Sequence, residues 1–90
     1  HMASAPGVSE RSVIVFGAME ASLTPLMEAV EAAHAGVKVF SLPSVDHPEH
    51  GAHIDLGVKG APAAVQAAYA DLRAWLVPFG LRYGPELVRP

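Results

Sequence analysis

Three histidines lie close together in one polar stretch of the sequence, residues 46–55. His47, His50 and His53 are spaced three residues apart, and three carboxylates accompany them. Imidazole and carboxylate groups are ligands that zinc and nickel accept in proteins. The spacing differs from the helical H-E-x-x-H motif, and Pro48 and Gly51 argue against a helix here. Two interpretations stay open: a metal site built on a loop, or a solvated loop that binds nickel only adventitiously, which we favour.

Glu20 is a second candidate for binding chemistry. It follows an apolar run and a glycine, in a predicted strand-to-helix loop, where small domains often bind ligands. The same carboxylate is explained by the helix dipole, which favours negative charge at a helix N-terminus. Glu20 therefore stays open as a residue for cofactor or ligand binding. His34 and Tyr69 lie on apolar helical stripes, and we expect them to be capping or core residues.

The sequence lacks other motifs of catalysis or nucleotide binding. It has no cysteine, which excludes disulfides, thiolate zinc sites and cysteine nucleophiles. It has no P-loop, Rossmann glycine motif or serine-nucleophile motif. Residues 57–60 have the G-x-x-G spacing of KH domains, but these glycines are explained as a turn from a strand to a helix. We expect a segment that is not catalytic by itself and binds no cofactor of its own.

The composition indicates one small domain that folds through apolar packing. The chain has 90 residues, of which 51% are hydrophobic and 17% charged, and its first two residues resemble a cloning remnant. Its net charge is −3 and its six Lys and Arg are scattered, which argues against nucleic acid and equally against an acidic partner. No apolar run approaches the roughly 20 residues that cross a bilayer. The prediction is a cytoplasmic domain without nucleic-acid or membrane partners.

The hydrophobic pattern predicts four strands and two helices in the order β-α-β-β-α-β. Residues 1–11 are predicted to be a disordered lead, 12–84 the domain and 85–90 a tail. Strands are expected at 13–16, 37–42, 53–59 and 81–83. Pro43 is expected to end the second strand and to open a long loop over 43–52. Helices are expected at 22–35, capped by Ser22 or Thr24 and followed by a left-handed Gly36, and from Pro62 to Leu76.

This order of elements is typical of the two-layer α+β sandwich of the ferredoxin-like, or split βαβ, type. Right-handed crossovers place the first and third strands in the centre of an antiparallel sheet, with both helices on one face. The alternation of residues puts Phe40 and Leu42 on the other face, and the first strand adds Ile14 and Phe16. We expect these four side chains to form an exposed apolar patch that binds a partner. The alternative is that Phe40 packs only under the hairpin loop.

Three segments carry a resemblance to a known family. Residues 17–26 read GAMEASLTPL, residues 36–43 read GVKVFSLP, and residues 53–60 read HIDLGVKG. They resemble, in order, the G-x-x-E-(S/A)-x-L-x-P-L, G-V-x-h-x-S-Y-P and h-I-E-L-G-V-K-G segments (h, apolar) that follow the molybdopterin-binding (MoCF) domain in the competence/damage-inducible protein A family. The similarity spans about residues 12–83. Leu42 departs from the aromatic residue that is common at its position.

The resemblance implies a C-terminal subdomain of a molybdopterin- or nucleotide-binding protein. In that family the ligand-binding residues belong to the upstream MoCF domain, so molybdopterin would bind there. Our leading hypothesis is a non-catalytic accessory domain whose uncovered sheet face packs against the upstream domain or a second copy of the chain. Two alternatives stay open: a stand-alone ACT-like domain that binds an amino acid near the first strand-to-helix loop, and metal binding by the histidines.

Overall fold

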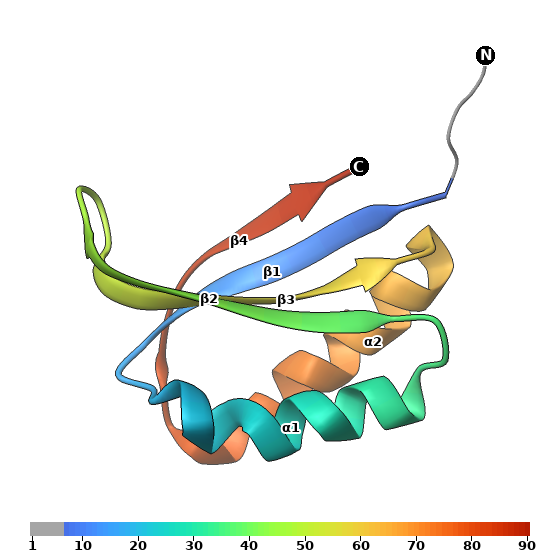
Figure 1. The fold of residues 1–90 in the computed structure, drawn as a ribbon, viewed down its shortest axis with the longest axis horizontal. Helices are drawn as coiled ribbons and strands as arrows, with labels where there is room; N and C mark the ends of the chain where they lie inside the picture. The colour runs from blue at the N-terminus through green and yellow to red at the C-terminus, as the bar shows by residue number, and fades with distance from the viewer. Residues whose placement is uncertain (1–6) are drawn as a thin grey trace.

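The computed structural model describes residues 7–90, and it has one sheet covered on one face by two helices (Figure 1). The elements are β1 (Ser9–Phe16), α1 (Glu20–Ala33), β2 (Lys38–His47), β3 (Gly51–Gly60), α2 (Pro62–Leu76), the 3-10 turn η1 (Val77–Phe79) and β4 (Arg82–Arg89). The strand order is β2-β3-β1-β4, and all neighbouring strands are antiparallel. This confirms the α+β sandwich of the ferredoxin-like type, with β1 and β3 in the centre.

A single hydrophobic core fills the space between the helices and the sheet. Alternate residues of the strands and one stripe of each helix contribute to it. The sheet supplies Val13, Val15, Val37, Ile54, Leu56 and Val58, and the helices supply Leu23, Leu26, Val30, Val65, Ala68, Tyr69, Leu72 and Leu76. The helical members recur every three or four residues, as one face of an α-helix requires.

The boundaries of α2 agree with the sequence prediction, whereas α1 lies two residues earlier than predicted at both ends and stops at Ala33. That helix begins at Glu20, two residues early, and its N-cap residue Met19 makes no side-chain cap. The predicted caps Ser22 and Thr24 are therefore wrong. Gly36 has the expected left-handed backbone, with φ +83°, and α2 runs from Pro62 to Leu76 as predicted. Within residues 7–90, neither helix is long and apolar enough to cross a membrane.

The β2–β3 hairpin is longer and more regular than predicted. Strand β2 continues through Pro43 to His47, and only three residues separate it from β3. The prediction that Pro43 ends the strand was wrong because β2 lies at the edge of the sheet. An edge strand tolerates proline where the backbone nitrogen points away from its neighbour. The backbone N–H of Val39, four residues earlier on the same side, indeed donates to Glu31 of α1 instead of to β3.

Both outer ends of the domain are also more ordered than predicted. Strand β1 starts at Ser9, so residues 9–11 of the predicted lead belong to the sheet, while residues 1–6 lie outside the described part. Strand β4 reaches Arg89, so the predicted tail is mostly strand. Pro85 is accommodated because the β1–β4 register shifts between Val13 and Val15, which leaves Ile14 opposite two residues. Such a bulge absorbs a residue that cannot donate a ladder hydrogen bond.

Candidate functional site

The face of the sheet opposite the helices, called here the open sheet face, holds the four residues predicted to form an interface. Ile14 and Phe16 lie on β1, and Phe40 and Leu42 lie on β2. They differ in accessibility: Ile14 is only 3% exposed, the two phenylalanines are half-buried, and Leu42 is 57% exposed. The prediction that all four side chains are exposed is therefore wrong for Ile14, and only Leu42 is strongly exposed, because the side chains of this face partly cover one another.

Two glycines of neighbouring strands receive the phenylalanine rings. A Cβ atom at Gly57 would lie 2.5 Å from the Phe40 ring, and one at Gly84 would lie 3.0 Å from the Phe16 ring. Each ring thus covers backbone where a side chain would otherwise stand. The sequence prediction placed Gly57 in the strand 53–59, which is confirmed, but also explained it by a turn into the helix, which is wrong, since the residue lies inside β3 without a positive φ. The alternative that Phe40 packs only under the hairpin loop is not what the structure shows.

The open sheet face also gathers most of the positive charge of the chain. Strand register places on it four of the six Lys and Arg but only two of the nine acidic residues. These are Lys38, Lys59, Arg82 and Arg89, with Glu10 and Asp55. The Arg89 guanidinium nitrogens lie 3.4 Å from a Glu10 carboxylate oxygen and 3.8 Å from one of Asp55. The Lys59 ammonium nitrogen lies 3.8 Å from the other Glu10 oxygen. The Arg82 guanidinium stacks on the Phe16 ring at 4.1 Å.

The structure brings the three predicted metal-binding histidines together at the end of the β2–β3 hairpin. The ring centroids of His47 and His50 are 4.8 Å apart, those of His47 and His53 5.2 Å, and those of His50 and His53 5.4 Å. The hairpin projects past the helical layer (Figure 1), and Phe16 of β1 contacts His50 edge to face at 6.3 Å. Sequence spacing alone could not show this, because it arises from strand pairing.

Glu20 lies between two shallow grooves at the start of α1. The Ser41 hydroxyl of β2 donates a hydrogen bond to its carboxylate. One groove, of about 390 Å³, runs between α1 and β2 and includes the acidic residues Glu28 and Glu31. The other, of about 280 Å³, lies between the β1–α1 loop and the base of the hairpin. The second groove is where an ACT-like ligand would bind, but the carboxylate nearest to it already has a partner within the fold.

No family model, curated protein or solved structure matches this chain. The resemblance to the region after the MoCF domain therefore stays a prediction.

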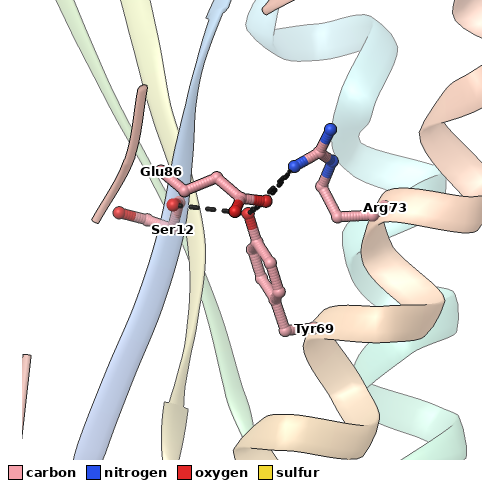
Figure 2. A network of polar contacts seen from close by, with 4 residues as sticks. All are labelled: Ser12, Tyr69, Arg73 and Glu86. Atoms are coloured by element: carbon pink, nitrogen blue, oxygen red, sulfur yellow. Dashed lines mark hydrogen bonds and ion pairs between the residues drawn. The ribbon is translucent and has the colours of Figure 1, made fainter. Parts of the chain in front are cut away.

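A polar network on the helix-covered side joins α2 to β1 and β4 (Figure 2). The Tyr69 hydroxyl donates to Glu86 at 2.7 Å and lies 3.5 Å from the Ser12 carbonyl, while Arg73 donates to Tyr69 at 3.2 Å and to Glu86. Burial, and then the hydrogen bond to Glu86, raise the pKa of Tyr69 to about 12. The hydrogen bond with Tyr69 raises the pKa of Arg73. This network could not be predicted from the sequence, because Glu86 falls in the segment 85–90 that was predicted to be a tail.

The structure gives His34 the structural role that was expected. It ends α1 as the C-cap residue, and its imidazole lies 2.7 Å from an Asp71 carboxylate oxygen of α2. The pair connects α1 to α2. His34 is therefore engaged within the fold and does not belong to the histidine cluster of the hairpin. We assign His34 and the Tyr69 network to stabilisation of the fold.

Proposed function

We propose that this chain is a non-catalytic interaction domain that binds another protein surface through its open sheet face. The observation that carries the proposal is the composition of that face: apolar side chains together with four of the six cationic residues of the chain, Lys38, Lys59 and Arg89 in one row at one end of the sheet and Arg82 at the other. Exposed apolar residues with a polar rim are typical of protein interfaces. Leu42, which is 57% exposed on the edge strand β2, would be the most accessible apolar contact of this face.

The edges of the sheet are poor binding surfaces by comparison. Strand addition needs a row of free backbone N–H and C=O groups. On β2, Pro43 has no N–H, and the Val39 N–H is already bonded to Glu31 at 2.8 Å. On β4, Pro85 interrupts the strand at the register shift. Binding through the face is therefore favoured over pairing through either edge.

The charge on the open sheet face selects the chemistry of the partner. Among residues 7–90, Lys38 and Arg82 have no carboxylate within ion-pair distance. Two copies stacked face to face would bring like charges together, which is unfavourable. A polynucleotide is also disfavoured, since base stacking needs a free aromatic face and Arg82 already covers Phe16. The best match is a protein surface with apolar residues surrounded by carboxylates.

The sequence resemblance supplies the identity of that partner. It implies a molybdopterin-binding domain encoded upstream in the same reading frame, and our proposal is that this domain covers the open sheet face. Molybdopterin would then bind the upstream domain. A cytoplasmic location is part of the same proposal and is compatible with a chain that has no cysteine.

An NMR titration tests the proposal directly. The ¹⁵N-labelled chain is titrated with the unlabelled upstream domain, and amide shifts should map to β1, β2 and β3 on the open sheet face. Leu42→Glu should weaken binding at least about tenfold, because it replaces the most exposed apolar side chain of the face by a charge. Val45→Glu is the matched control, since Val45 is 82% exposed on the same strand and is not among the residues of the predicted interface.

Three results would contradict the proposal. The first is that Leu42→Glu and Val45→Glu weaken the binding of the upstream domain equally. The second is that the amide shifts are confined to the helices. The third is preferential binding of a single-stranded oligonucleotide. A reading frame that encodes no such upstream domain would contradict this choice of partner.

A further inference from the structure

The histidines at the end of the β2–β3 hairpin form a cluster that the proposed interface does not use. His47 ends β2, His50 lies in the turn, and His53 lies on β3. The hairpin holds them together through the pairing of Ser44 with His53 and of His47 with Gly51. The cluster is therefore a product of strand register and not of a loose loop, which was the favoured interpretation of the sequence.

We propose that His47, His50 and His53 bind one divalent transition-metal ion of the zinc, nickel or copper class. Such ions take imidazole nitrogen at about 2.0–2.1 Å, so two nitrogens of a tetrahedral site lie about 3.4 Å apart. Ligand atoms of His47, Glu49 and His50 already lie within 4.8 Å of one another. The ring centroid of His53 on β3 lies 5.2 Å from that of His47 and 5.4 Å from that of His50, so side-chain rotation must bring its ligand nitrogen to the same ion. Glu49 offers a fourth ligand.

The hydrogen bonds of the rings show which nitrogens are available. His53 Nδ1 lies 2.9 Å from the Gly51 carbonyl, an acceptor, so this nitrogen carries the proton and Nε2 has a free lone pair. A carbonyl that fixes the tautomer of an imidazole in this way is the usual support of a metal-binding histidine. Neither ring nitrogen of His50 has a hydrogen-bond partner among residues 7–90. His53 and His50 are thus ready to act as ligands.

His47 is different, and this gives the site a structural signature. Its Nδ1 accepts hydrogen bonds from the backbone N–H groups of Glu49 at 3.0 Å and of His50 at 3.2 Å. With Nδ1 as acceptor, the neutral ring carries its proton on Nε2 and offers no lone pair there. Metal binding must therefore displace these two N–H groups or move the proton to Nδ1. Either event frees the amides of Glu49 and His50, so the turn changes when the metal binds.

The charge around the cluster is suitable for a cation. The segment 41–58 contains no Lys or Arg and three carboxylates. A divalent ion placed there meets the carboxylates of Asp46 and Glu49, and no lysine or arginine of the hairpin opposes it. From other strands, Arg89 is paired with Asp55 at 3.8 Å, and Arg82 stacks on Phe16, whose ring contacts His50.

Zinc titration by isothermal calorimetry tests the site. The protein carries His1→Ala, because that histidine lies outside the described residues and could bind metal independently. We expect one Zn²⁺ per chain with submicromolar affinity, no heat with Mg²⁺, and shifts of the Glu49 and His50 amide signals on binding. His53→Ala should weaken the affinity by on the order of 10- to 100-fold or more. His50→Ala gives a second test, should His53→Ala unfold, and Val45→Ala is the non-ligand control.

Every other outcome overturns the proposal. Two results would indicate adventitious binding to a solvated hairpin. The first is an affinity for Zn²⁺ weaker than micromolar. The second is more than one Zn²⁺ per chain, bound equally well by His53→Ala and His50→Ala. Tight binding that leaves the Glu49 and His50 amides unchanged would exclude His47 as a ligand. Loss of binding on replacing His1 alone would place the metal outside the hairpin.

Discussion

At the scale of single residues, the contact between Phe40 and Gly57 explains why position 57 needs a glycine: the Phe40 ring occupies the space of a side chain there. The alternation of residues along β2 predicted the face on which Phe40 lies. It did not predict the neighbour, because Phe40 pairs with Gly57 through the β2–β3 register. A sequence pattern fixes the face of a strand, whereas cross-strand contacts depend on how strands are aligned. Gly57 was therefore placed in the correct strand, but its being a glycine was explained by a turn, because its contact with Phe40 could not be predicted.

Gly57→Ala should destabilise the fold strongly. The added methyl would lie 2.5 Å from the Phe40 ring, 2.5 Å from Ser12 Cβ and 2.6 Å from the Arg11 carbonyl. The ring could move, but the backbone of the central strand could not, so we expect a loss of about 1–3 kcal/mol or more. Urea unfolding measures it. Gly7→Ala, with no atom within 4 Å of its added Cβ, is the control and should be neutral; similar stability of the two variants would refute this account of Gly57.

The Tyr69 hydroxyl is the second residue-scale feature with a measurable consequence. Burial disfavours loss of the hydroxyl proton, and the pKa of Tyr69 rises from the ordinary 10.0 to about 12. Between these two values the unfolded chain has lost the proton and the folded chain has kept it. The stability that this group contributes is therefore complete below pH 10 and is lost as the pH rises toward 12.

We expect the free energy of unfolding of the wild type to fall by up to roughly 3 kcal/mol over that range. Tyr69→Phe should be less stable at neutral pH by about 1–3 kcal/mol, because it leaves its partners unsatisfied. It should also lack the Tyr69 part of the decline above pH 10. Urea unfolding from pH 8 to 11.5 provides the measurement, with Tyr83→Phe as the control. An identical pH slope in wild type and Tyr69→Phe would show that the hydroxyl is not the titrating group.

At the scale of elements, prediction succeeded where the signal was local and failed where it depended on neighbours. The sequence predicted the apolar stripe of α2 and both of its ends, Pro62 and Leu76, because hydrophobic periodicity and proline act within one helix. The continuation of β2 through Pro43 depends on its being an edge strand, and the length of β4 depends on pairing with β1. Neither fact is present in the segment itself.

Glu31→Ala should loosen the outer edge of β2. It removes the carboxylate that accepts the Val39 N–H at 2.8 Å. Because the bond is exposed, we expect a modest loss of about 0.5–1.5 kcal/mol, and faster hydrogen exchange at the Val39 amide. Glu28→Ala, one turn earlier on α1, is the control and should change neither quantity. Equal exchange rates in the two variants would mean that the carboxylate does not protect the edge.

At the scale of the whole molecule, the distribution of charge matters more than its sum. The net charge of −3 argued against an acidic partner, as an average over the surface would. The fold instead separates the charges, with most cations on the open sheet face and most carboxylates on the helices and hairpin. That separation could not be predicted from composition, because it needs the face of every strand. It is the reason why the proposed partner carries carboxylates, although the net charge alone argued against an acidic partner.

The arrangement of β1 beside β4 has a mechanical consequence. The two strands are antiparallel, and Glu10 near the start of β1 pairs with Arg89 at the end of β4. A force that pulls the two ends of the domain apart would therefore load the hydrogen bonds of this ladder one at a time. The strands would open like a zipper instead of resisting in shear. A domain tethered at both ends would yield at low force, starting with β4, while β1, β2, β3 and the helices stay folded.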